Sequence, residues 1–192
     1  NKIDNHFINM THPDYKVFSD NGTVANLNIS NSCNGSEDVN MNLGAYRFVC
    51  SNGLWALDRI EDSSSVIKHT QENYEQLANI ICGVNAKTQG VMQKFATLEE
   101  TELDEYSKEH LAERASLIRF QPGFLNYKQL LNVTREEDRG NGLWTVYNRI
   151  QENLTQSGRL VDATGKVLGG TITPREDMRV NKELFGLVHA YA

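Results

Sequence analysis

The sequence has little proline, little cysteine and no long apolar run. Three prolines occur among 192 residues, and no stretch approaches the roughly 20 apolar residues that a membrane-spanning helix needs. The three thiols, Cys33, Cys50 and Cys82, match no zinc-binding spacing, and widely spaced cysteines in odd number are typical of a reduced, cytoplasmic protein. We therefore expect a cytoplasmic chain with no membrane segment and no bound metal.

Motifs of the common enzyme classes are also missing. The Gly-rich stretch 158–170 lacks the Gly-x-x-x-x-Gly-Lys-Ser/Thr pattern of phosphate-binding loops, and neither a serine nucleophile elbow nor a metal-spaced histidine cluster occurs. We expect no cofactor, and a non-enzymatic protein is favoured. The formal net charge of −6 argues against a strongly basic nucleic-acid-binding protein but leaves room for a local basic face. Because the chain begins at Asn1 rather than at methionine, we expect an N-terminal portion to be missing.

The first third of the chain has the alternating pattern of short strands. Residues 1–14 are polar and irregular, with His12-Pro13 as a breaker, and 37–43 is compatible with a strand or a loop. Strands are predicted at 15–18, 24–29, 44–50, 55–60 and 65–68. The short connections between them favour antiparallel pairing.

From Glu72 the apolar residues recur with helical spacing. The pattern predicts a long helix to Phe95, then a helix capped by Thr97 and Glu100 that ends before Gln121. Further helical segments are predicted at 126–131, 143–156 and from 174, with a charged loop at 135–142 and a mobile loop at 159–170. Strands followed by helices predict a single α+β domain over 1–192, with a sheet part at about 15–70 and a helical part at about 72–192.

One candidate site surrounds the strand at 44–50, which lies between two Asn-Gly turns. Arg47 with Cys50, Asn52 and His69 could bind a phosphate or carboxylate, because arginine suits bidentate anion contacts. The alternative is an Arg47 paired with a nearby acid, an Asn52 that holds its turn, and a buried structural thiol at Cys50. Lys68 and His69 could contact a nucleic-acid backbone or form a solvated strand end.

A second candidate site interleaves basic and aromatic residues. Such a pattern suits single-stranded nucleic acid, whose bases stack on rings while its phosphates are neutralised. The residues are Arg135, Arg139, Arg149, Trp144 and Tyr147. Trp144 and Tyr147 also lie on the apolar stripe of the predicted helix, so core packing is the alternative. The carboxylates between 99 and 109 form either a solvated face or a docking surface.

Several segments together resemble one family, the phage- and plasmid-like proteins called domain of unknown function 932. The matching segments are Asn31-Ser-Cys-Asn-Gly-Ser36, Tyr46-Arg-Phe-Val-Cys-Ser-Asn-Gly-Leu54, Lys68-His-Thr70, Trp144-Thr-Val-Tyr147-Asn148 and Asn181-Lys-Glu-Leu184. The resemblance covers about residues 18–187. Cys33-Asn34 replaces the family's usual His-Asp, so a role that needs that pair, such as metal binding, does not carry over. The resemblance implies a mobile-element origin and no established activity.

Three functions follow as hypotheses. The first is a non-enzymatic, nucleic-acid-binding protein of a mobile element, acting on single-stranded DNA by binding or annealing in replication or recombination. The second is an interaction module that binds a host protein, for example to inhibit a defence system, through the acidic face. The third is an enzyme centred on Arg47, Cys50 and His69. A homo-oligomer is compatible with each of them.

Overall fold

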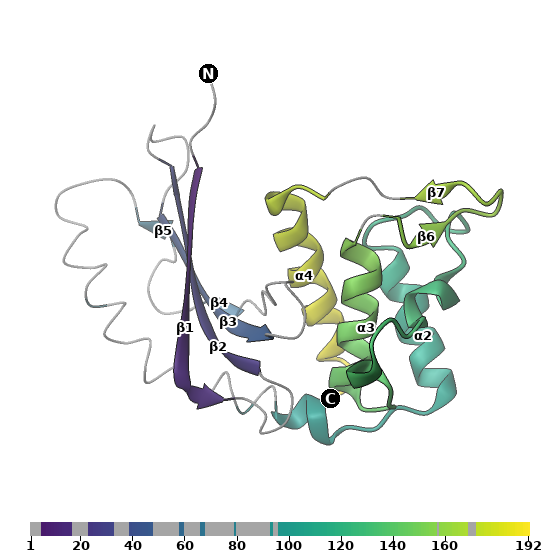
Figure 1. Ribbon diagram of the computed structural model, residues 1–192, viewed down its shortest axis with the longest axis horizontal. Helices are drawn as coiled ribbons and strands as arrows, with labels where there is room; N and C mark the ends of the chain where they lie inside the picture. The colour runs from purple at the N-terminus through teal and green to yellow at the C-terminus, as the bar shows by residue number, and fades with distance from the viewer. Residues whose placement is uncertain are drawn as a thin grey trace. The chain divides into compact units, whose positions relative to one another are not determined.

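The protein has an α+β fold (Figure 1). The computed structural model describes residues 5–16, 23–32, 39–47, 58–59, 66–67, 79, 93, 96–156, 158–168 and 172–192. The chain divides into two compact units, Asn1–Lys94 and Phe95–Ala192. Within the described residues, every helix is too short or too polar to cross a membrane.

The first unit carries an antiparallel sheet of five strands, as the alternating patterns predicted. The strands are β1 (Asn5–Lys16), β2 (Thr23–Ser32), β3 (Val39–Arg47), β4 (Asp58–Arg59) and β5 (Val66–Ile67). They lie in the order β1-β2-β3-β4, and β5 also pairs with β3. The register places Leu27 of β2 opposite Met10 of β1 and Leu43 of β3. Leu27 is buried, whereas Met10 on the edge strand is exposed.

The start of the chain differs from the prediction. Residues 1–14 were expected to be irregular, but Asn5–Lys16 is the longest strand of the sheet. An edge strand tolerates proline because one side of it needs no ladder hydrogen bonds. The pairing of β1 with β2 shifts register between His12 and Lys16, which accommodates Pro13. The undecided segment at 37–43 contains the first part of β3.

The second unit is built from helices and one small hairpin. Its helices are α2 (Glu105–Ser116), the 3-10 helices η1 (Tyr127–Leu131) and η2 (Glu136–Asp138), α3 (Leu143–Thr155) and α4 (Pro174–Val188). Strands β6 (Leu160–Val161) and β7 (Val167–Leu168) form the hairpin. The hairpin replaces part of the loop predicted at 159–170. The long helix predicted to precede this unit lies outside the described residues, apart from Asn79 and Gln93, which are helical.

Helix α3 is the centre of the second unit, because side chains on nearly all of its faces are buried. The apolar residues buried in this unit include Leu111, Leu130, Val146, Ile150, Leu154, Val180 and Leu184. They come from α2, η1, α3 and α4, and Figure 1 shows the three α-helices side by side. The positions of α3 and α4 agree with the predicted helices, including Thr173 as the N-cap and Pro174 as the first helical residue.

The predicted N-cap at Thr97 is wrong. Thr97 lies within a helical segment at 96–100, and α2 begins eight residues after it, with Asp104 as N-cap accepting a 2.7 Å hydrogen bond from Ser107 N. Between the two helical segments the chain pairs with the residues before α3, through Leu103 N to Asn141 O at 2.9 Å. These tertiary hydrogen bonds hold residues 101–103 out of a helix.

Helices α2 and α3 run in the same direction. The backbone bond from Leu103 to Asn141 joins the segments that precede both helices. At their other ends, the guanidinium of Arg119, just after α2, donates to the carbonyl of Leu154 in the last turn of α3. Helix α4 runs the opposite way, since Arg179 near its start donates at 3.0 Å to a backbone carbonyl just after α2. The second unit therefore has two distinct ends.

Candidate nucleic-acid interface

The site predicted in the first unit is only partly described. Arg47 is the last residue of β3, with its backbone opposite Thr23 of β2. The surroundings of its side chain lie outside the described residues, and so do the other members, Cys50, Asn52, Lys68 and His69. The anion-binding role of this group stays a prediction.

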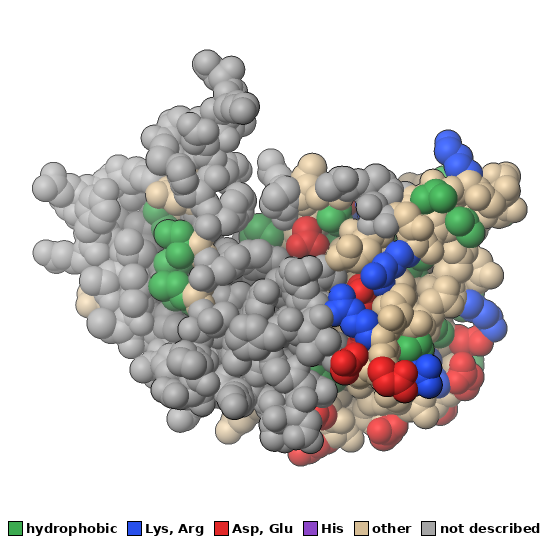
Figure 2. Space-filling view, in the orientation of Figure 1, with side chains coloured by type: hydrophobic (Ala, Val, Ile, Leu, Met, Phe, Trp, Pro, Cys, Tyr) green, Lys and Arg blue, Asp and Glu red, His purple; other side chains and the backbone are tan. Residues whose placement is uncertain are grey.

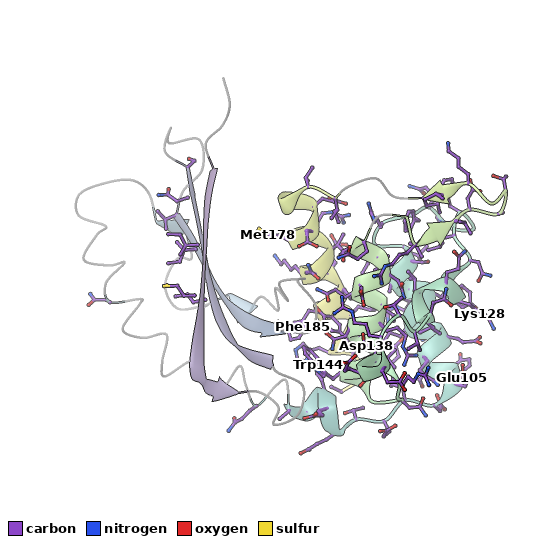
Figure 3. All side chains as sticks on the ribbon, viewed as in Figure 1. Glu105, Lys128, Asp138, Trp144, Met178 and Phe185 are labelled. Carbon is purple, nitrogen blue, oxygen red and sulfur yellow. The ribbon has the colours of Figure 1, made fainter. Side chains whose placement is uncertain are left out.

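Trp144 and Tyr147 form part of the core of the second unit. Their side chains are 1% and 0% exposed, and their rings stack with centroids 5.5 Å apart. The ring of Phe185 on α4 meets Tyr147 edge-on at 6.2 Å, and Figure 3 shows Trp144 and Phe185 in the same part of the unit. Bases stack on exposed ring faces. The described geometry therefore favours the packing alternative for both aromatic residues.

Two of the motif segments noted in the sequence, 144–148 and 181–184, lie on α3 and α4, and a buried hydrogen bond joins these two helices. The amide of Gln151, one turn after Asn148, donates at 2.8 Å to the side-chain oxygen of Asn181. Asn148 donates at 2.7 Å to the carbonyl of Trp144, within its own helix. These amides are almost fully buried. Helices α3 and α4, which carry these segments, thus share a buried polar contact.

Arg135, the first basic residue of the predicted site, binds a buried carboxylate. Its Nε and Nη2 lie 3.2 and 2.9 Å from Glu152 Oε1, and the hydroxyl of Thr134 donates to Glu152 Oε2 at 3.0 Å. A second guanidinium, that of Arg159, reaches the same Oε1 at 2.9 Å. The side chain of Glu152 is buried, whereas those of Arg135 and Arg159 are 23% and 32% exposed. Both cations therefore keep a side that faces water.

These residues form a positively charged cluster at the C-terminal end of α3. We define the C-terminal cluster as Arg119, Arg135, Glu152 and Arg159. Three guanidiniums surround one carboxylate and the last carbonyls of α3, where the helix dipole is negative. The cluster has a formal charge of +2, in a chain whose net charge is −6. This local excess is the kind of basic face that the overall composition left open.

Arg139 and Arg149 lie further along the same side of α3. Arg139 is exposed and pairs with Glu136 at 3.0 Å. Arg149 is buried and donates to the carbonyl of Asp138 at 2.6 and 3.2 Å and to that of Gly140 at 2.9 Å. Burial lowers the pKa of the Arg149 guanidinium, and the charge of Asp138 opposes this shift. Arg149 is a structural residue that fastens the segment before α3.

Carboxylates gather at the opposite end of the second unit. Figure 2 shows Asp and Glu side chains along the lower edge, where residues 96–104 and the start of α2 lie in Figure 1. Glu99, Glu100 and Glu105 are exposed there, and Tyr106 beside them is 77% exposed. Most of the predicted acidic face is thus solvent-accessible. We call residues 99–106 the acidic edge.

Arg119, Glu152 and Arg159 were missed in the sequence. Arg119 follows the last turn of α2 and precedes a Phe-Gln-Pro-Gly-Phe segment, which is a local signal for a cation at a helix end. Glu152 and Arg159 give no such signal, because their pairing depends on how residues 134–135 return along α3. No group of three or more His, Cys, Asp or Glu in the described part of the chain is arranged to hold a metal ion.

Comparisons with known proteins agree with the sequence resemblance. The chain is 31% identical over 144 residues to UPF0380 protein YafZ and 29% identical over 144 residues to UPF0380 protein YfjQ, both of Escherichia coli strain K12. Each alignment covers 70% of this chain and 50% of the relative, so the chain spans about half the length of these relatives. No solved structure matches the chain. The family described as "Domain of unknown function (DUF932)" matches residues 2–185, and the chain belongs to this family.

Proposed function

We propose that this chain is a non-enzymatic, nucleic-acid-binding protein of a phage- or plasmid-like element. It binds single-stranded DNA during replication or recombination, in the cytoplasm of the host cell. The observation that carries the proposal is the C-terminal cluster, in which two water-accessible guanidiniums share one buried carboxylate. Membership of a family without an assigned activity is compatible with this role and does not supply it.

The cluster has the chemistry of a phosphate-binding site. A guanidinium has five N–H donors, and Arg159 has more of them than its contact with Glu152 uses. Arginine forms paired hydrogen bonds with phosphate oxygens. Glu152 holds the two side chains in place, which reduces the entropy that they lose when a phosphate binds.

The first experiment removes the two exposed cations. Binding of fluorescent oligothymidylate to wild type and to the double variant Arg135→Ala, Arg159→Ala is measured by anisotropy over a range of salt concentrations. Loss of two phosphate contacts should weaken binding and reduce the slope of log K against log salt by about 1.4. Lys128→Ala is the control, because Lys128 is exposed and pairs with Glu109 of α2, outside the cluster. Wild-type binding that is absent at low salt, or unchanged in the double variant, would refute the proposal.

A second variant should act in the opposite direction. Glu152→Gln keeps a hydrogen-bond acceptor near both guanidiniums but removes the negative charge. The cluster then has one more net positive charge, so affinity for oligothymidylate should rise several-fold at low salt. A lower affinity in a variant that remains folded would contradict phosphate binding at this cluster.

The acidic edge supports a second candidate function, the binding of a basic host protein. Its exposed carboxylates are near neighbours in the chain of the exposed Tyr106, and an aromatic residue with charged neighbours is typical of protein interfaces. Tagged wild type and the variant Tyr106→Ala would be used to isolate partners from a host lysate. A single host protein captured by wild type and lost with the variant supports this function. Identical captures from the two would exclude it for this surface.

A further inference from the structure

Two phenylalanine rings lie on the turn that follows α2, one exposed (Phe124) and one half-buried (Phe120). We define the aromatic turn as residues 119–125. The rings of Phe120 and Phe124 are stacked, with centroids 6.3 Å apart and planes inclined by 18°. The guanidinium of Arg119 lies 5.7 Å from the centroid of the Phe120 ring. Phe124 is 48% exposed, which is unusual for a large aromatic side chain in a unit with a well-filled core.

The aromatic turn is held at both ends. Arg119 donates to the Leu154 carbonyl of α3, and Leu125 is buried and bridges to Asp162 of the hairpin segment. Within the turn, Phe124 N donates to Gln121 O at 3.1 Å, and Gly123 has a φ of +75°, which glycine adopts without steric cost. Rings fixed in this way lose little conformational freedom when a flat ligand binds to the exposed one, Phe124.

The aromatic turn adjoins the C-terminal cluster, because Arg119 belongs to both. Its guanidinium contacts the last turn of α3, where Glu152 binds Arg135 and Arg159, and it also lies over the Phe120 ring. Aromatic rings beside guanidiniums are one of the two alternatives that the sequence left open for Trp144 and Tyr147. In the structure this arrangement occurs at different residues.

We propose that Phe120 and Phe124 form a stacking platform for the bases of a single-stranded nucleic acid whose phosphates contact the C-terminal cluster. This inference rests on the proposed function and adds the mode of recognition. Stacking on a ring face suits every base, so the platform binds unpaired nucleotides without a strong sequence preference. Duplex nucleic acid keeps its bases stacked inside the helix and is a poor ligand for it.

The test compares an ordinary oligothymidylate with an abasic oligomer of the same length. The two carry the same phosphates, so a difference in affinity measures contacts to bases. Wild type should bind the base-containing oligomer more tightly, and Phe124→Ala should reduce that affinity by about 5- to 100-fold while leaving affinity for the abasic oligomer nearly unchanged. Phe124→Tyr should retain the preference. Leu117→Ala is the matched control, because Leu117 is 51% exposed just before the turn but has no ring.

The outcomes separate this inference from the proposed function. Equal binding of both oligomers by wild type, with normal salt dependence, would overturn the stacking platform and keep phosphate binding. Loss of binding to both oligomers in Phe124→Ala, with an unchanged circular dichroism spectrum, would also overturn it. Capture of a protein partner through Phe124, without any oligomer bound, would assign the rings to a protein interface instead. A parallel series with oligouridylate shows whether the ligand is DNA or RNA.

Discussion

At the scale of single residues, Glu152 determines the chemistry of the second unit. Its carboxylate is buried and accepts hydrogen bonds from Thr134 and Arg135, and it also binds Arg159. A buried carboxylate is tolerated only when it is well paired, and here two guanidiniums provide the compensation. The same residue thus stabilises the unit and limits the positive charge of the cluster.

Replacement of Glu152 should therefore reduce stability while it increases anion affinity. We expect Glu152→Gln to lower the free energy of unfolding by about 1–3 kcal/mol, below the effect at a fully buried pair, because Arg135 and Arg159 both reach water. Urea denaturation of wild type and variant measures the change. A variant as stable as wild type would mean that the three charged groups contribute no net free energy to folding.

At the scale of helices and strands, local signals succeeded where no tertiary contact opposed them. Thr173 and Pro174 predicted the start of α4 because capping and a fixed φ are properties of the residues themselves. Thr97 offered an equally good signal and was wrong, because residues 101–103 pair with the segment before α3. The strands of the hairpin have two residues each, too few for an alternating pattern.

The candidate site follows the same rule: local patterns predicted single residues, and tertiary contacts determined their partners. Arg135 was identified from its neighbours in sequence. Its partner Glu152 is 17 residues away, and nothing in the sequence predicted that the two side chains pair. Trp144 and Tyr147 fitted two patterns at once. They alternate with basic residues, as in a nucleic-acid-binding surface, and they lie on the apolar stripe of a helix, as in a core. Burial decided between the patterns, and burial depends on α4, which sequence spacing alone does not place beside α3.

The cap of α4 gives a prediction at this scale. The hydroxyl of Thr173 accepts a hydrogen bond from Glu176 N at 3.3 Å. Thr173→Ala should lower the free energy of unfolding by about 1 kcal/mol, because one backbone N–H at the helix start loses its partner. Thr173→Ser keeps the hydroxyl and serves as the control. Thermal denaturation of wild type and the two variants measures this loss of stability. Equal melting temperatures for the alanine and serine variants would contradict the capping role.

The hairpin gives a prediction for pH. Asp162 Oδ1 accepts hydrogen bonds from the hydroxyl of Thr164 at 2.6 Å and from the backbone N–H groups of Thr164 and Lys166 at 2.8 and 3.0 Å. The Thr164 hydroxyl above all lowers the pKa of Asp162. A lowered pKa in the folded state means that this stabilisation is complete above the ordinary pKa of aspartate and is lost as the pH falls through the folded value.

Asp162→Asn should consequently remove part of the acid sensitivity of the protein. The melting temperature of wild type should exceed that of the variant at neutral pH, and the difference should shrink below about pH 4. Melting curves of both proteins, recorded from pH 7 down to about pH 2.5, measure this difference in melting temperature. A difference that grows on acidification would show that the sign of the shift is opposite.

At the scale of the whole molecule, the division at Lys94 and Phe95 places the five-stranded sheet in one unit and helices α2, α3 and α4 in the other. The buried apolar residues Leu111, Ile150 and Leu184 come from three helices of the second unit. We expect a fragment of residues 95–192 to fold alone and to unfold in one cooperative transition. Circular dichroism with thermal denaturation tests this. A fragment without helical signal would instead favour the single domain that the sequence predicted.

The parallel orientation of α2 and α3 affects the charge distribution of the second unit. Carboxylates collect where both helices begin, and guanidiniums collect where both end, so the unit has a permanent dipole moment along its helices. In the field of a polyanion such a body experiences a torque before contact, with its arginine end turned forward. The rate of encounter, rather than the lifetime of the complex, is then the quantity most sensitive to changes among distant acidic side chains.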